Sequence, residues 1–199
     1  VAASRTHRYE ISNFNLSARD IALRHAFPLE VDCSINGAAL EVAGQVNLLQ
    51  RDIKADATLT RLEMGAFSPY FASAFPGTLR NLALSAQLSV DATPKTISSE
   101  GQITLDDITL NLDAFPDAPI EAATFALKYT ATYSPAEAAV ELANAELNYN
   151  GIKSNISGDI QNLDSTPTLK LDLTSPPIEV PTLFEALPPQ LVASTQEMN

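Results

Sequence analysis

The residues that decide the fold of this 199-residue chain are Ala-Thr-Phe-Ala-Leu-Lys-Tyr-Thr-Ala-Thr-Tyr at positions 123–133. Every odd position carries an apolar or aromatic side chain, whereas Thr124, Lys128, Thr130 and Thr132 hold four of the five even positions. Successive side chains of a β-strand point to opposite faces of the sheet. The stretch therefore predicts a half-buried strand of an antiparallel sheet with one wet face.

Four other stretches show the same alternation. Residues 82–90 and 169–173 place leucine or another apolar residue at every second position, and residues 53–59 do so with smaller side chains. Within residues 101–112 the apolar residues stand at odd positions up to Leu105 and at even positions from Ile108 onward. The shift falls at Asp106-Asp107, where one extra residue in the strand would bring the apolar side chains back to the same face. This pair therefore predicts a β-bulge or a tight bend.

Two Asn-Gly pairs are the strongest turn signals in the chain. A type I′ turn needs a positive φ at both central residues, which Asn and Gly supply most easily. Asn36-Gly37 therefore predicts that residues 30–35 pair with 38–43. In the same way, Asn150-Gly151 predicts that residues 144–149 pair with 152–157.

The two turns belong to an internal repeat. Asn36-Gly37 recurs as Asn150-Gly151 at an offset of 114 residues (150 minus 36), and Gly44 recurs as Gly158 at the same offset. Leu59-Thr60 likewise recurs as Leu173-Thr174. Repeated β units of this kind usually build one extended surface rather than one catalytic pocket.

Two short helices are expected among the strands. Ser68-Pro69 supplies an N-cap followed by a proline at the first helical position, which predicts a helix over about residues 69–75. Thr182 and Glu185 form a capping box, which predicts a helix over about residues 182–187.

The predicted fold is mainly β: an antiparallel meander that forms a curved, groove-like sheet from about two related repeat units, with two short helices. We expect a first β repeat unit over residues 1–76 and a second over 77–189, each ending in a short helix. Residues 190–199 are expected to form a frayed tail.

Composition excludes several classes of function. The net charge of −12 and the pI near 4.4 argue against nucleic-acid binding, which needs Lys and Arg to neutralise phosphates. The same charge argues against electrostatic adsorption to anionic membranes. The lone cysteine, Cys33, allows no internal disulfide, and a buried structural thiol is the favoured interpretation.

Residues capable of catalysis are sparse and scattered. His7 and His25 are the two histidines, and no serine stands in a nucleophile-elbow sequence. Zinc needs three or four ligands, and no close grouping of His, Cys and Asp supplies them. Asp106-Asp107 with Asp113 offers carboxylates for calcium, but the glycine and the terminal glutamate of an EF-hand are absent. We therefore predict that the protein is not an enzyme, with no catalytic residue, metal site or cofactor.

Several segments resemble the AsmA family of bacterial envelope proteins. Residues 11–21 followed by Pro28-Leu-Glu-Val resemble the strand entry of AsmA-like repeats, as does Gly44-Gln-Val-Asn leading into residues 53–64. Residues 67–79 resemble the helix and Pro-Gly-x-Leu joint of the family. Residues 99–110 resemble its recurrent strand pair. The resemblance covers roughly residues 10–187.

The resemblance implies a location and a function. AsmA-like and TamB-like proteins are envelope proteins of diderm bacteria, usually with an N-terminal inner-membrane anchor. They are described as elongated curved sheets whose apolar interior is proposed to carry phospholipid between the inner and outer membranes. We accordingly expect a periplasmic segment, anchored to the inner membrane by a part absent from this chain. Phospholipid or another acyl lipid is the expected partner, together with other envelope proteins and a second copy paired through edge strands.

The predicted lipid-binding groove is lined by the apolar residues of the alternating strands. Its expected lining residues are Ile103, Leu105, Phe125, Leu127, Tyr129, Leu169, Leu171 and Leu173. Alternation alone does not distinguish an open groove from a closed core, since both bury the same positions. The alternative is therefore a closed structural β-sandwich that mediates protein–protein contacts in the envelope.

Overall fold

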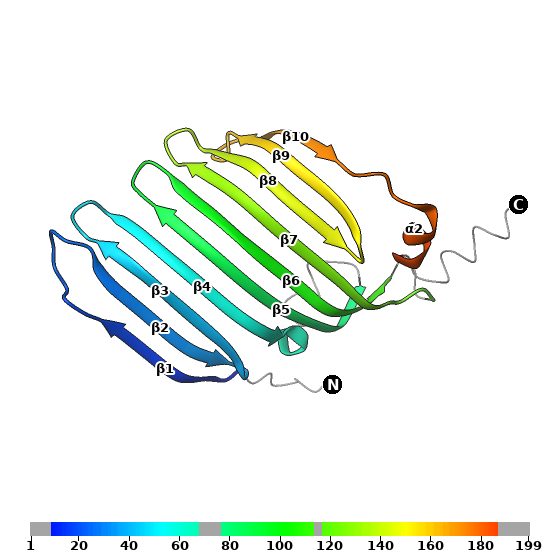
Figure 1. Cartoon of the computed structure of the whole chain (residues 1–199), viewed down its shortest axis with the longest axis horizontal. Helices are drawn as coiled ribbons and strands as arrows, with labels where there is room; N and C mark the ends of the chain where they lie inside the picture. The colour runs from blue at the N-terminus through cyan, green and yellow to red at the C-terminus, as the bar shows by residue number, and fades with distance from the viewer. Residues whose placement is uncertain (1–8, 68–76, 114–116, 187–199) are drawn as a thin grey trace, which may run out of the picture.

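A computed structural model of the chain describes residues 9–67, 77–113 and 117–186. They form one ten-stranded antiparallel sheet in which every strand pairs with its neighbours in the sequence (Figure 1). The strands are β1 Ile11–Ala18, β2 Phe27–Ile35, β3 Ala38–Asn47, β4 Asp52–Glu63, β5 Gly77–Ala92, β6 Ile97–Leu112, β7 Ile120–Ser134, β8 Ala139–Tyr149, β9 Ile152–Gln161 and β10 Thr168–Thr174. The sheet does not close into a barrel, and β1 and β10 form its two edges. The predicted mainly-β antiparallel meander is confirmed.

The described helices are short. A 3-10 helix, η1, spans Met64–Phe67, and α2 spans Val180–Ala186. The prediction that the second helix begins at Thr182 is wrong by two residues: Leu183 N–H donates to the Glu179 carbonyl, 3.1 Å away, so the first turn already includes Val180. Pro181 fits that turn because its missing N–H would have no partner there. The expected helix over 69–75 and the tail over 190–199 lie outside the described residues.

Both predicted hairpins are confirmed. Asn36 and Gly37 have φ of 49° and 87°, and Asn150 and Gly151 have φ of 47° and 86°, as type I′ turns require. Ile35 pairs with Ala38 across the first turn. Across the second turn, Tyr149 pairs with Ile152 in the same way.

Each turn asparagine also binds the backbone beside its hairpin, at Thr124 of β7 for Asn150 and at Glu10, immediately before β1, for Asn36. The Asn150 Oδ1 accepts a hydrogen bond from the Thr124 N–H at 2.7 Å, and the Asn150 N–H donates to the Thr124 carbonyl at 3.1 Å. Asn36 makes the same two bonds with Glu10, both at 2.8 Å. The side-chain amide thus continues the ladder beyond the last backbone pair, which the sequence pattern alone did not indicate.

The predicted bulge at Asp106-Asp107 is confirmed. The pairing of β6 with β7 shifts register between Leu105 and Ile108, and Asp107 has a φ of 54°. Opposite it, Arg61 of β4 also has a positive φ, and its Nη2 lies 2.6 Å from Asp107 Oδ2. This exposed ion pair raises the pKa of Arg61 and connects irregularities in β4 and β6 across β5.

The repeat has a shorter period than the sequence comparison indicated. β2, β5 and β8 end at Ile35, Ala92 and Tyr149, which are 57 residues apart (92 minus 35, and 149 minus 92). The strand after each of them contains a glycine, and these glycines, Gly44, Gly101 and Gly158, keep the same spacing. The offset of 114 residues is therefore two steps of 57, each three strands long.

The hairpin of β5 and β6 was not predicted because its turn lacks the Asn-Gly pair of the other two. Thr93-Pro94-Lys95-Thr96 replaces Asn-Gly between β5 and β6. The Thr93 hydroxyl accepts hydrogen bonds from the N–H groups of Lys95 and Thr96, at 3.2 and 3.1 Å. This hydroxyl turn closes the strand pair without any residue of positive φ within those four.

The described residues enclose little core. Buried apolar residues are mostly alanines, and no large side chain among the described residues is fully buried. Among the described residues, the extensive contacts between elements join neighbouring strands, apart from smaller ones of η1 with β5 and of α2 with β9. A sandwich needs two packed sheets. The alternative prediction of a closed β-sandwich therefore does not describe this part of the chain, which forms one layer.

We predict that Gly151→Ala lowers the free energy of unfolding by about 1–2 kcal/mol, since an L-residue with a side chain is strained in the left-handed region. No atom lies within 4 Å of the position of an added Cβ, so backbone strain alone sets the cost. Urea unfolding measures it. The control is Gly65→Ala, whose Cβ meets nothing closer than 3.9 Å at an ordinary φ. Equal losses in both variants would contradict this explanation.

Candidate functional site

The two faces of the sheet have opposite chemistry. Directly paired residues of an antiparallel ladder lie on the same face, so the register can be followed from strand to strand. One such path, the apolar rung, crosses all ten strands and contains no charged residue. Its members, from β1 to β10, are Leu16, Val31, Val42, Ala57, Leu88, Gly101, Tyr129, Ala145, Ile156 and Leu173.

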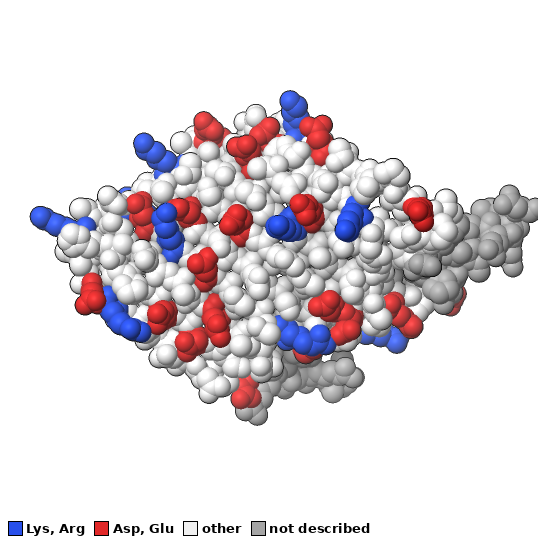
Figure 2. All heavy atoms as spheres, in the orientation of Figure 1, with Lys and Arg blue, Asp and Glu red and all other residues white. Residues whose placement is uncertain are grey.

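The path one residue away along the strands lies on the other face and is polar throughout. This polar rung consists of Asn15, Asp32, Glu41, Thr58, Gln87, Gln102, Lys128, Glu146, Asn155 and Thr174. We call the side of the sheet that holds the apolar rung the apolar face and the opposite side the polar face. Figure 2 shows charged side chains scattered across the sheet on the side turned to the viewer.

All eight residues predicted to line a groove lie on the apolar face, in two groups. Leu105 pairs with Phe125, and Ile103 pairs with Leu127, so these four form one patch with Tyr129 on β6 and β7. Leu169, Leu171 and Leu173 lie on the edge strand β10, where they are 59%, 44% and 68% exposed. β8 and β9 separate the two groups.

Apolar residues fill the interval between these groups. Leu147 pairs with Leu127, and Tyr149 pairs with Phe125, so β8 extends the first patch. Ile156 pairs with Ala145 and with Leu173, which joins β8 to the edge strand. The apolar face is therefore continuous from β6 to β10.

The prediction missed the N-terminal half of this face. Leu16, Val31 and Val42 of β1 to β3 belong to the apolar rung, as does Leu88 of β5. The alternation around these residues shows which side chains of one strand share a face. It does not show which of the two faces they share with the next strand. The cross-strand register, including a shift in β1 between Ser12 and Asn15, decides which parities share a face.

Tyr129 lies at the centre of the apolar face and contacts the neighbouring strand β6. It pairs with Gly101, and its hydroxyl lies 3.0 Å from the Ser99 hydroxyl. A Cβ at Gly101 would meet Leu88 Cδ2 at 2.6 Å, so the space above this glycine is already occupied. An aromatic side chain opposite glycine compensates for the missing contact area, and the hydrogen bond gives each hydroxyl a polar partner on an apolar surface.

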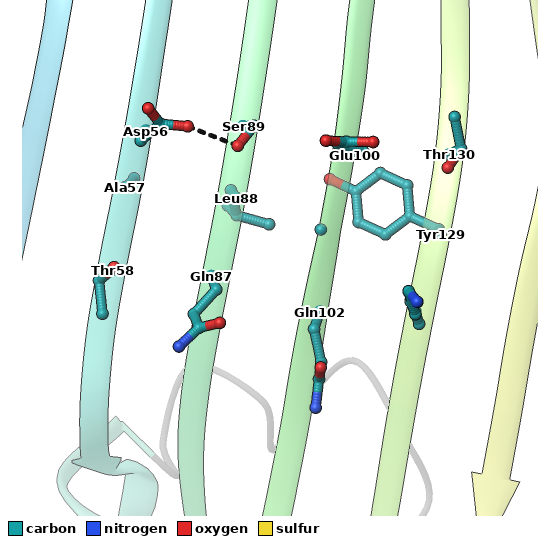
Figure 3. A pocket seen from close by; sticks show the side chains of 12 residues that line it. Asp56, Ala57, Thr58, Gln87, Leu88, Ser89, Glu100, Gln102, Tyr129 and Thr130 are labelled. Atoms are coloured by element: carbon teal, nitrogen blue, oxygen red, sulfur yellow. Dashed lines mark hydrogen bonds between the residues drawn. The ribbon is translucent and has the colours of Figure 1, made fainter.

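The polar face carries a shallow hollow of about 640 Å3 over β4 to β7. Side chains from four adjacent strands line it, and Ser89 donates a hydrogen bond to Asp56 (Figure 3). Glu100, Gln102 and Lys128 complete the wall on β6 and β7. Among the described residues, no cluster of three His, Cys, Asp or Glu side chains could hold a metal ion.

Comparison with protein-family models, with characterised proteins and with solved structures finds no match for this chain. Within the described part of the chain, no helix has the length and apolar character needed to cross a membrane. A functional assignment therefore has to be based on the different chemistry of the two faces of the sheet.

Partial burial on the apolar face raises the pKa of Tyr149 above its ordinary value of 10.0. The folded state therefore keeps the phenol proton in a pH range just above 10 where the unfolded chain has lost it. The stability that depends on the neutral phenol is complete below pH 10 and is lost as the pH rises through the folded-state pKa. We predict that unfolding free energy falls more steeply above pH 10 in the wild type than in Tyr149→Phe.

The tyrosinate absorbance of the two proteins gives the second measurement. The difference between their titration curves isolates Tyr149 and should show a midpoint above 10. A midpoint at the ordinary value would mean that water reaches this part of the apolar face freely.

Proposed function

We propose that the protein binds lipid acyl chains along the apolar face of its sheet, as a periplasmic module of outer-membrane biogenesis or inter-membrane phospholipid transport. The observation that carries this proposal is the apolar rung that crosses all ten strands, on a sheet with no second layer packed against it in the described residues. The resemblance of residues 10–187 to AsmA-like proteins supports the same assignment.

The energetics favour an apolar ligand. A sheet normally buries its apolar face against another layer, and here large side chains at both edges stay exposed: Leu16 is 58% and Leu173 is 68% exposed. Burial of apolar surface contributes roughly 25 cal/mol per Å2, or about 0.8 kcal/mol per methylene. An acyl chain of ordinary length lying on this face would therefore gain several kcal/mol.

The mechanism needs burial but no reaction. The apolar rung contains one hydroxyl, that of Tyr129, and this hydroxyl is already paired with Ser99. Because no unpaired polar side chain lies on this rung, nothing on it fixes a headgroup or one register, and an acyl chain is free to slide along it. The polar face keeps the complex soluble, and the net charge of −12 opposes adsorption of this face to anionic bilayers.

We predict that Leu127→Glu abolishes lipid binding without unfolding the chain. Leu127 lies at the centre of the apolar patch, between Ile103 and Leu147. A carboxylate there would have to be desolvated beneath a bound acyl chain, whereas in the lipid-free protein it stays hydrated. Native mass spectrometry with lipid extraction, on protein purified from a bacterial host, measures the bound phospholipid.

Ala126→Glu provides the matched control. It adds the same charge one residue away, on the polar face, where Ala126 pairs with Thr104 and Asn148. We expect it to bind lipid like the wild type, and far-UV circular dichroism should be the same for all three proteins. A wild-type mass without ligand, unchanged after incubation with phospholipid, would contradict the proposal.

A further inference from the structure

The edge strand β10 is a regular strand with a free side. It pairs with β9 through seven consecutive residues without any register shift, and among the described residues it has no second neighbour. All seven of its residues are exposed. α2 lies beyond the end of β10 rather than alongside it (Figure 1). An unpaired edge of this kind presents free N–H and C=O groups to another strand.

The opposite edge is different. β1 contains a bulge between Ser12 and Asn15, where Asn13 has a φ of 53°. Bulges on edge strands disturb the row of hydrogen-bonding groups and disfavour pairing with a further chain. The two edges are therefore not equivalent, and β10 is the one suited to accept a strand.

The sequence of β10 is complementary to itself. Thr168-Leu-Lys-Leu-Asp-Leu-Thr174 reads the same in both directions, except that Lys170 and Asp172 exchange places. In an antiparallel pair of two such strands centred on Leu171, threonine faces threonine and leucine faces leucine. Each Lys170 then faces Asp172 of the second copy, so the pair gains two opposite-charge contacts.

We propose that two copies of this chain associate through β10 in a two-fold symmetric, antiparallel strand pair. The two-fold axis of such a pair is perpendicular to the sheet, so both copies turn their apolar faces to the same side. Leu169 of each copy faces Leu173 of the other, and the apolar face continues across the junction. The bulged β1 edges lie at the outer ends, so the assembly closes as a dimer. This inference does not depend on lipid binding.

Charge substitutions test the proposal through their pattern. Lys170→Asp places two aspartates opposite each other at both contacts, and Asp172→Lys places two lysines there. Each single variant should weaken the dimer by about tenfold or more, because like charges directly opposite are destabilising. An equimolar mixture of the two variants restores both contacts and should form heterodimers. The double variant K170D/D172K should dimerise like the wild type.

Sedimentation velocity of the lipid-free full chain over a wide concentration range measures these equilibria. Lys153→Asp, on the polar face of β9, is the control with the same change of charge away from the edge, and it should dimerise normally. Far-UV circular dichroism checks that each variant is folded. Wild-type protein that stays monomeric at every concentration would overturn the proposal. Single variants that associate as the wild type does would also overturn it, since association would then use the apolar face or β1.

Discussion

The structure depends on one constraint, namely that cross-strand register keeps the side-chain alternation of ten strands in phase. A slip of one residue in any pair would move all apolar side chains of the following strands to the other face. The apolar and polar rungs run side by side from β1 to β10, so no such slip occurs along them. Chemical separation of the two faces is the direct consequence.

Turns, bulges and closely packed glycines maintain this register between neighbouring strands. The Asn-Gly turns fix the register of β2 with β3 and of β8 with β9. Asn150 also binds Thr124 of β7, and Asn36 binds Glu10 immediately before β1. Where a strand gains a residue, as at Asp107, the positive φ takes up the change and pairing resumes beyond it. The glycines at 44, 101 and 158 meet neighbouring strands so closely that a Cβ at any of them would lie within 2.6 Å of another atom.

The sequence was sufficient for features set by neighbouring residues. The two hairpins, the bulge at Asp106-Asp107 and the common face of residues 123–133 all follow from local patterns, and the structure confirms them. Features that depend on pairing between strands were not accessible. The place of Leu16 and Val31 on the apolar face needs the register of β1 with β2, and the 57-residue period was hidden by a Thr-Pro turn. The start of α2 at Val180 was missed because a capping pattern at Thr182 resembled a start signal.

The central claim is that the apolar face is the surface that lipid covers, and the lone cysteine allows a direct test. Cys33 pairs with Leu40 on the apolar face, and the adjacent Ser34 points to the polar face. A nitroxide attached at Cys33, or at residue 34 in a Cys33→Ser, Ser34→Cys chain, reports contact with oxygen and with a water-soluble nickel complex. On adding phospholipid, we predict more oxygen contact and less nickel contact at position 33, with no change at 34. Equal responses at the two positions, or none at either, would contradict the account.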